Sequence, residues 1–128
     1  MAASYKQNEK LKEIADKVIS ENENLKILSN PKCRIAFQYS DEKKKSKNKT
    51  VFADTEKVKD KLKVFLPYDF LVTFYEPNTA NLTDEKLEHL MYHELRHIGF
   101  TEEGKMFIVP HDIEDFRDVI DQWGIDWI

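Results

Sequence analysis

The sequence predicts a single α+β domain spanning residues 1–128, with an N-terminal helix, a small, mostly antiparallel sheet of three to four strands, and two further helices. A chain of 128 residues is long enough for one hydrophobic core but not for two. Apolar residues recur with helical spacing near the N-terminus and again around residues 84–98, and strand-like apolar runs lie between. Glycine and proline are scarce, at 3 and 4 residues, which favours regular elements over loops.

The first predicted helix covers residues 4–21. Its apolar residues follow the spacing that places them on one helical face, and they are Leu11, Ile14, Ala15, Val18 and Ile19. Residues 21–31 are polar, offer few side chains to bury and end at the helix breaker Pro31. This first helix is therefore expected to pack on the sheet.

Two strands joined by a lysine-rich tip come next. Residues 33–40 alternate between apolar and polar side chains, which predicts a half-buried strand, and residues 51–58 are expected to return as a second strand. A solvated hairpin tip is predicted over residues 41–50, which hold Lys43, Lys44, Lys45, Lys47 and Lys49. A short charged turn or helical piece is expected at residues 59–64.

The most apolar run of the chain, residues 69–75, predicts a strand covered on both faces. Thr83 is a good helix N-cap, Asp84 and Glu85 suit the first helical turn, and Gly99 suits a helix stop, so a helix is expected over residues 84–98. A C-terminal helix is expected to begin near His111, with one apolar face made of Ile113, Phe116, Ile120 and Trp123.

Composition limits the classes of function. The net charge of −4 argues against a general nucleic-acid binder, and the lysine-rich tip lacks an interleaved aromatic to stack on bases, although a nucleic-acid contact through these lysines stays possible. Cys33 is the only cysteine, which excludes an intramolecular disulfide and a four-cysteine zinc site. There is no apolar signal core and no apolar run near the roughly 18 residues of a membrane span. We therefore expect a soluble cytoplasmic protein with no membrane partner; the sequence leaves its oligomeric state open.

The segment His93-Glu94-Leu95-Arg96-His97 carries the main chemical signal. On a helix, residues four apart are offset by about 40° and about 6 Å of rise, so both imidazoles leave one face and can converge on a metal ion. Glu94 lies on the adjacent stripe, where its carboxylate is placed to take a proton from water rather than to bind the metal. The pattern predicts a zinc site used for hydrolysis.

The helical wheel separates a packing face from this chemical face. Leu87, Met91, Leu95 and Ile98 form one apolar stripe, while His93, His97, Leu90 and Glu94 share the other side. His89 lies four residues before His93 on that same side, but the residue after it is Leu90, so this pair lacks a base. We interpret His89 as a residue at the cleft rim or one that supports a ligand.

A catalytic zinc site has three protein ligands and an open position. His111 is the remaining histidine and the preferred third ligand; the competing candidates are Glu102, Glu103, Asp112, Glu114 and Asp115. Asp112 and Asp115 are also candidates for orienting an imidazole. An oxyanion donor is needed as well, and the sequence does not choose between Tyr68, Tyr92 and Arg96.

These segments resemble the phage metallopeptidase domain family, whose members are zincin-like and occur in phage and prophage genomes. The resemblance rests on residues 66–70, 82–85, 91–98 and 111–116 and runs from about Cys33 to the C-terminus. It implies zinc held by His93, His97 and His111, Glu94 as the catalytic residue, and a bacterial host cytoplasm. A more distant similarity is to the SprT-like and Spartan proteases.

The chain departs from two other zinc protease patterns. Gly99 and Glu103 do not reproduce the glycine and histidine that follow the metzincin motif, and the downstream glutamate of thermolysin-like enzymes is missing. The function predicted is a zinc metallopeptidase acting on a protein or peptide substrate. The alternative is a zinc-containing binding or regulatory module without turnover, which could associate with nucleic acid. Its zinc site would be closed by a fourth protein ligand such as Asp112 or His89.

Overall fold

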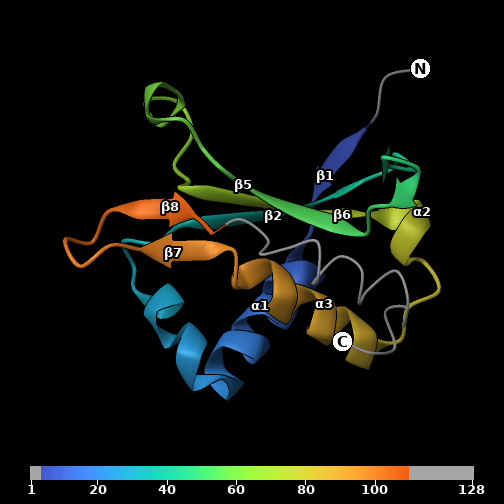
Figure 1. Ribbon diagram of the computed structural model, residues 1–128, viewed down its shortest axis with the longest axis horizontal. Coiled ribbons are helices and arrows are strands. Elements are labelled where there is room, and N and C mark those ends of the chain that lie inside the picture. Colours follow the sequence, from blue (N-terminus) through green and yellow to red (C-terminus); the bar gives the residue numbers. More distant parts are fainter. Residues whose placement is uncertain (1–3, 110–128) are drawn as a thin grey trace.

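A computed structural model describes residues 4–109 of the chain, so the predicted C-terminal helix lies outside the described residues. The main sheet has four strands in the order β1-β2-β6-β5 (Figure 1), with bounds Tyr5–Gln7, Ile35–Ser40, Phe70–Tyr75 and Ala53–Lys57. β2 and β6 are parallel, whereas the β1–β2 and β5–β6 pairs are antiparallel. The predicted α+β class and its mostly antiparallel sheet are confirmed.

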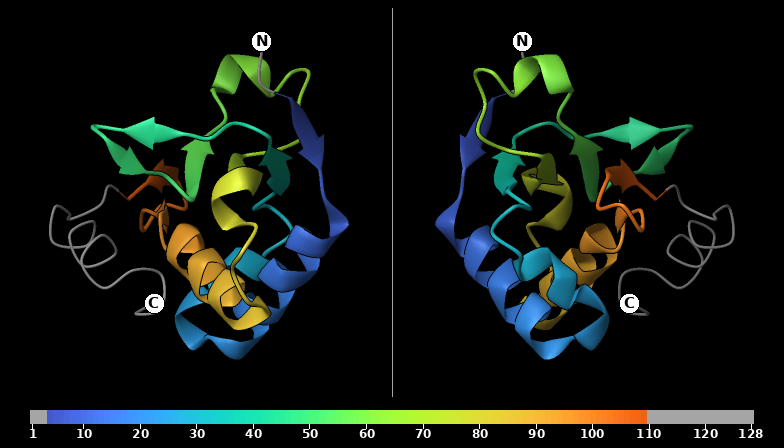
Figure 2. Two further views of the ribbon diagram at one scale, coloured as in Figure 1. Left: turned by 90° about the vertical axis from the view of Figure 1, so that its right-hand side faces the viewer. Right: turned by 90° about the vertical axis from the view of Figure 1, so that its left-hand side faces the viewer.

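The main helices cover one face of this sheet. Helix α1 (Glu9–Glu21), the 3₁₀ helix η1 (Glu23–Ser29) and helix α3 (Asp84–Leu95) lie together below the strands (Figure 2). The shared core is a set of buried side chains from α1, η1, the strands and α3: Leu11, Ala15, Val18, Leu25, Leu28, Phe37, Phe70, Val72, Phe74, Leu87, Leu90, Met91 and Leu95. The core therefore fixes α3, which carries His93 and Glu94, against the sheet.

The N-terminal helix is shorter than predicted. It begins at Glu9, because the side chain of Asn8 accepts a hydrogen bond from the backbone N–H of Leu11 at 3.1 Å and caps the helix there. Residues 5–7 instead form the edge strand β1, paired with the end of β2. The polar segment that follows α1 also forms structure, since η1 buries Leu25 and Leu28.

The lysine-rich tip is a hairpin, as predicted. Strands β3 (Lys45–Ser46) and β4 (Lys49–Thr50) pair antiparallel around Lys47 and Asn48, whose φ angles of 52° and 65° are those of a tight hairpin turn. Farther along, the predicted charged turn contains the 3₁₀ helix η2 (Asp60–Leu62), and the short helix α2 (Glu76–Thr79) follows β6.

Helix α3 begins as predicted but ends earlier. The Thr83 side chain accepts from the N–H of Lys86, and the helix ends at Leu95, with Arg96 as its C-cap. The chain then forms a hairpin of β7 (Ile98–Phe100) and β8 (Met106–Ile108). Gly99 is thus a strand residue, and the prediction of a helix to residue 98 was wrong at its end because a tight turn, with His97 N–H donating to the Glu94 carbonyl at 3.0 Å, redirects the chain.

In the part of the chain that the structure describes, no helix has the length and apolar character needed to cross a membrane.

Candidate metal centre

The motif residues lie at the end of α3 that faces strand β5 and the β7–β8 hairpin. His93 and Glu94 are buried, with exposed fractions of 4% and 3%, and His97 is partly buried just beyond the helix. Leu87, Leu90, Met91 and Leu95 are all buried too, so this helix is covered on more sides than its wheel predicts. The motif is therefore held rigidly on an element of the core.

His93, Glu94 and His97 each offer one ligand atom, and these three atoms lie within 4.8 Å of one another. The two imidazole rings stand nearly perpendicular, at 77°, with centroids 5.1 Å apart. Nε2 of His93 lies 3.9 Å from the Glu94 carboxylate. The predicted convergence of the two histidines is therefore present, although His97 follows the helix end instead of continuing it.

The ring of His97 is oriented by the last described residue. Its Nδ1 lies 2.7 Å from the carbonyl oxygen of Val109, and that oxygen can only accept, so Nδ1 carries the proton. The backbone N–H of Val109 in turn donates to the His97 carbonyl at 2.6 Å. Nε2 is thereby left with its lone pair and is shielded from solvent.

The protonation state of His97 also suits a ligand. Burial lowers its pKa, the hydrogen bond to Val109 acts in the opposite direction, and the charge of Arg96 lowers the pKa further. The net result is a lowered pKa and a neutral imidazole at neutral pH, which is the form that binds metal ions. A divalent cation that prefers nitrogen ligands fits this donor set.

Glu94 is held by strand β5. The hydroxyl of Thr55 lies 2.9 Å from Oε1 of Glu94 and 3.1 Å from its backbone carbonyl oxygen. Burial raises the pKa of Glu94 to about 8; the Thr55 hydrogen bond opposes this rise and the charge of Asp54 adds to it. A nearby cation would favour the carboxylate form.

A cavity of about 290 Å³ opens beside Glu94 and His97. Its walls come from the lysine-rich hairpin, β5 and β8, and the other residues that line it are Lys44, Ser46, Val51, Ala53, Asp54, Thr55, Ile108 and Val109. The carboxylate of Asp54 has two partners. The Tyr75 hydroxyl donates a hydrogen bond to it at 2.6 Å, and the Lys44 ammonium lies 3.6 Å away. The cavity thus has charged groups of both signs beside the motif, on a wall that also contains apolar side chains.

The other predicted site residues of the described chain lie away from this cavity. His89 and Tyr92 line a separate recess next to α1, and the Tyr92 hydroxyl accepts from Asn24 at 2.9 Å. Arg96 is exposed and lies over the Tyr92 ring. Glu102 and Glu103 are exposed in the turn between β7 and β8.

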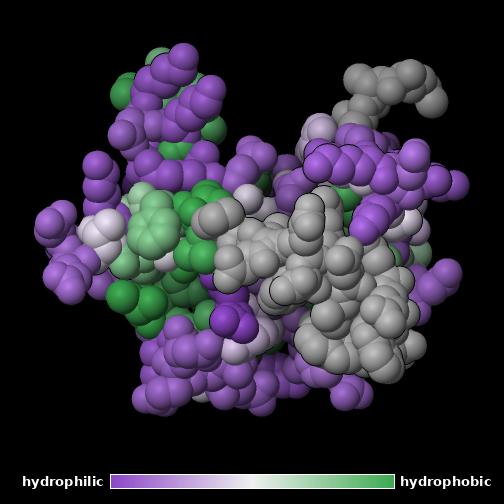
Figure 3. All heavy atoms as spheres, viewed as in Figure 1, coloured by the Kyte–Doolittle hydropathy of each residue, from purple (hydrophilic) through white to green (hydrophobic). Residues whose placement is uncertain are grey.

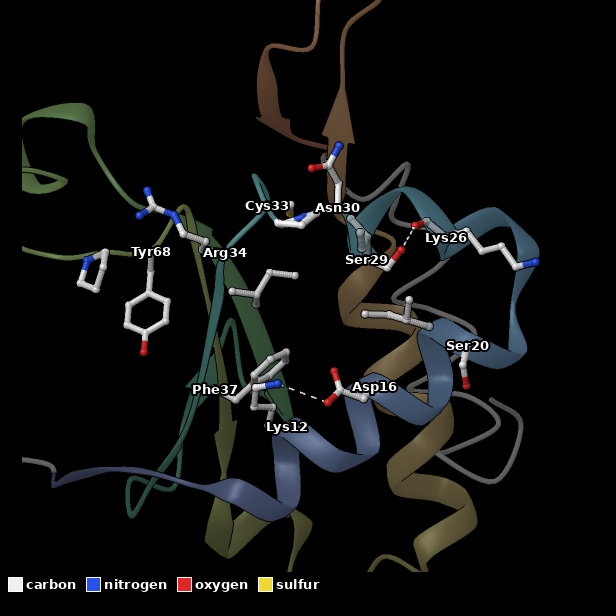
Figure 4. A pocket seen from close by; sticks show the side chains of 15 residues that line it. Lys12, Asp16, Ser20, Lys26, Ser29, Asn30, Cys33, Arg34, Phe37 and Tyr68 are labelled. Carbon is white, nitrogen blue, oxygen red and sulfur yellow. Dashed lines mark hydrogen bonds and ion pairs between the residues drawn. The ribbon is translucent and has the colours of Figure 1, made fainter.

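Tyr68 lines a third and larger cavity, of about 870 Å³, together with residues of α1, η1 and the start of β2 (Figure 4). None of the three oxyanion candidates therefore lines the cavity at Glu94. The third-ligand candidates His111, Asp112, Glu114 and Asp115 lie outside the described residues.

Four groups of the site are absent from the sequence prediction: Lys44, Asp54, Thr55 and the Val109 carbonyl. Asp54 and Thr55 belong to a strand whose pairing register decides which side chains meet α3, and one sequence does not give that register. A backbone carbonyl leaves no signal in residue type at all.

No curated protein and no solved structure matches the chain. The distant similarity to the SprT-like and Spartan proteases therefore stays a resemblance of motif. The model of the family described as "Putative phage metallopeptidase" matches residues 3–127, which is nearly the whole chain. The chain belongs to this phage metallopeptidase family.

Proposed function

We propose that this protein is a zinc-dependent peptidase with a zincin-like site. One observation carries the proposal: His93, Glu94 and His97 present ligand atoms within 4.8 Å of one another, and Glu94 and His97 line a cavity. The family assignment supports peptide-bond hydrolysis as the reaction class. Two imidazole nitrogens are the donors that zinc favours, and Nε2 of His97 is fixed for this role by the bond from Nδ1 to Val109.

His111 is proposed as the third ligand. Val109 lines the cavity, and two residues of chain span at most about 7 Å, so the sequence allows a donor at position 111 to serve this cavity. The carboxylates of Asp112, Glu114 and Asp115 are the competing donors, and they follow His111 within a few residues.

Glu94 is proposed as the general base and acid of the reaction. When bound, the cation supplies a Lewis acid that polarises the scissile carbonyl and makes a water molecule more acidic. The Glu94 carboxylate accepts the proton of the attacking water and then donates it to the leaving amine. Thr55 holds the carboxylate at the cavity wall during both transfers.

Tyr68, Tyr92 and Arg96 lie away from the cavity at Glu94, so none of the three is proposed as the oxyanion donor. The proposed setting is the cytoplasm of a phage-infected bacterium, in agreement with the family and with the free thiol of Cys33.

The test combines metal analysis with the Glu94→Gln variant. We expect one zinc ion per chain in both proteins, cleavage of a random peptide library by the wild type, and no cleavage by the variant. Glu85→Gln, on an exposed position of the same helix, is the matched control and should cleave normally. Stoichiometric zinc without any cleavage by the wild type would favour a zinc-binding module, and unchanged cleavage by Glu94→Gln would reject the role of Glu94.

The third ligand has its own test. His111→Ala should lose zinc, whereas His89→Ala should retain it because His89 lines a different recess. Retention of stoichiometric zinc by His111→Ala would reject His111 as a ligand.

A further inference from the structure

The lysine-rich hairpin, residues 41–50, contributes one wall of the cavity at the metal-binding motif. Lys44 and Ser46 line the same recess as Glu94 and His97. Hydrophilic side chains gather over this hairpin at the upper right of the molecule (Figure 3). A segment expected to be a solvated tip is thus part of the site.

The base of the hairpin is fixed by hydrogen bonds. The Asn78 side-chain amide donates to the carbonyl oxygens of Lys44, at 3.1 Å, and of Val51, at 2.7 Å. The Val51 N–H also donates to the Lys44 carbonyl at 3.1 Å. The backbone of Lys44 is therefore anchored to α2 and to the segment that precedes β5, so the position of its Cα is fixed.

The ammonium of Lys44 retains capacity for a ligand. It lies 3.6 Å from the Asp54 carboxylate and 5.3 Å from the centre of the Tyr75 ring, and its side chain is 38% exposed. A contact of 3.6 Å is longer than a good hydrogen bond, and an ammonium has three donors. Asp54 itself is already bound by the Tyr75 hydroxyl at 2.6 Å.

Charge is segregated toward this wall. The hairpin has five lysines and only the acidic residues Asp41 and Glu42, in a chain whose net charge is −4. Only Lys44 of these five lysines lines the cavity, and the other four give the hairpin beside it a positive potential that attracts anionic groups. Asp54, which also lines the cavity, is partly neutralised by its contact with Lys44.

We infer that Lys44 selects polypeptides that carry a carboxylate beside the scissile bond, either an Asp or Glu side chain or a free C-terminus. This inference rests on the proposed peptidase function, because it places the selected group in the cavity of Glu94. The remaining lysines of the hairpin guide acidic segments to the site, and Lys44 makes the contact.

The test measures binding separately from cleavage. Zinc-loaded Glu94→Gln protein is titrated with peptides of one sequence whose central residue is Glu or Gln and whose C-terminus is free or amidated. We expect about three- to tenfold tighter binding of the peptide bearing the recognised carboxylate, with the preference weakened by salt. Comparison of the four peptides identifies whether the protein recognises the side-chain carboxylate or the C-terminal carboxylate.

Substitutions of lysine residues test whether Lys44 makes the contact with the peptide carboxylate. Adding Lys44→Gln should abolish the preference, and Lys44→Arg should preserve it. Lys61→Gln, on the exposed helix η2 away from the cavity, is the matched control and should bind as the parent does. Equal binding of all four peptides, or a preference that survives Lys44→Gln, would overturn the inference, as would salt-dependent duplex DNA binding at Lys44 in place of peptide binding.

The same experiment separates this inference from the proposed function. Lys44-dependent peptide binding by a protein that cleaves nothing would reject the peptidase function and leave the carboxylate selectivity standing. Cleavage without regard to peptide charge would reject the selectivity alone.

Discussion

The hydroxyl of Thr55, on the edge strand β5, lies 2.9 Å from Oε1 of Glu94 and 3.1 Å from the backbone oxygen of that same residue. A hydroxyl has a single proton, so Thr55 can donate to only one of them. When the Glu94 carboxyl is protonated, it can donate to Thr55 while Thr55 donates to the carbonyl. When it is ionised, Thr55 can donate to the carboxylate. The strand therefore holds Glu94 in place in both protonation states.

The substitution Thr55→Val removes this hydroxyl at nearly constant volume. We expect kcat to fall roughly tenfold to a hundredfold with little change in KM, because a less well-oriented base transfers protons less efficiently. Zinc content should remain at the wild-type level, since Thr55 contacts neither histidine in the described hydrogen bonds. Steady-state kinetics and metal analysis of the same preparations give the result.

Thr55→Ser keeps the hydroxyl and is the control for this change. It should retain most of the activity. Equal losses in Thr55→Val and Thr55→Ser would show that packing of the methyl group, and not the hydrogen bond, accounts for the effect.

Gly99 is predicted to be essential for the position of Val109. A Cβ at this position would lie 2.6–2.9 Å from side-chain atoms of Phe107 and Val109. Gly99→Ala should therefore push the exposed Phe107 ring and the Val109 side chain aside, cost about 1 kcal/mol of unfolding free energy and weaken zinc binding severalfold, because the Val109 carbonyl orients His97. Denaturant unfolding and zinc titration measure the two effects.

Gly104 offers the matched comparison within the same hairpin. Its φ is +84°, but nothing lies within 4 Å of an added Cβ. Gly104→Ala should cost about 1–2 kcal/mol from backbone strain and leave zinc affinity unchanged. An equal loss of zinc affinity in both variants would contradict the link between Gly99 and the site.

Cys33 should be unreactive in the folded protein. It is buried, and burial, assisted by the charge of Asp69, raises its pKa to about 11 from an ordinary value of 9.0. At pH 8 its thiolate fraction is therefore about a hundredfold below that of an ordinary thiol, and iodoacetamide should label it only after denaturation. Labelling at equal rates in native and denatured protein would contradict this expectation.

The same shift predicts a pH effect on stability. The unfolded chain loses the Cys33 proton near pH 9 and the folded chain only near pH 11, so the stability contributed by the neutral thiol is lost as the pH rises through this window. The difference in unfolding free energy between wild type and Cys33→Ala should shrink over this range. If this difference in unfolding free energy stayed constant from pH 9 to pH 11, the predicted shift in the pKa of Cys33 would be contradicted.

Asp69 is predicted to be a structural carboxylate. Burial alone would raise its pKa, but the backbone N–H of Arg34 and the side chains of Lys63 and Arg34 outweigh burial and lower the pKa below its ordinary 3.8. Asp69→Asn should cost about 1–3 kcal/mol at neutral pH, as expected when a buried charge-assisted hydrogen bond is lost. The Asp69 carboxylate contributes to stability above pH 3.8, and this contribution disappears as the carboxylate is protonated. The unfolding free energies of the wild type and the variant should therefore converge in acid.

The control for Asp69 is Asp60→Asn. Asp60 is exposed and pairs with Lys57 and Lys63 at 3.7 and 3.5 Å, so its loss should change stability little at any pH. If the difference in unfolding free energy between the wild type and Asp69→Asn persists in acid, Asp69 stabilises the fold through packing and not through its charge.

Much of the fold follows from local patterns in the sequence. The helical spacing from Leu11 to Ile19 predicts α1, the apolar run at residues 69–75 predicts β6, and Thr83 marks the start of α3. The convergence of His93 and His97 is also predictable, because four residues of helix fix it.

The parts that escape prediction depend on contacts distant in sequence. Ile98 continues the apolar stripe of α3 and is buried, but it is a strand residue, so periodicity alone extends the helix too far. Residues 5–7 become a strand because the edge of β2 is available to them, and Lys44 enters the site because Asn78 anchors the hairpin. Such events are set by tertiary packing, which overrides local propensity.

The parallel pairing of β2 with β6 has a consequence for how the chain folds. Arg34 and Asp69, joined at the start of this pair, are 35 residues apart, so the pairing requires closure of a long loop. Closure of such a loop costs entropy before any contact compensates for it, and non-local pairing of this kind slows folding. The loop contains the whole lysine-rich hairpin and β5. We therefore expect assembly of the cavity to be a late, cooperative step. Asp69→Asn should slow refolding in stopped-flow experiments. An unchanged refolding rate would show that the contact between Arg34 and Asp69 forms only after the transition state of folding. Errors in forming the central sheet would thus cost the protein its fold and its candidate metal site in the same event.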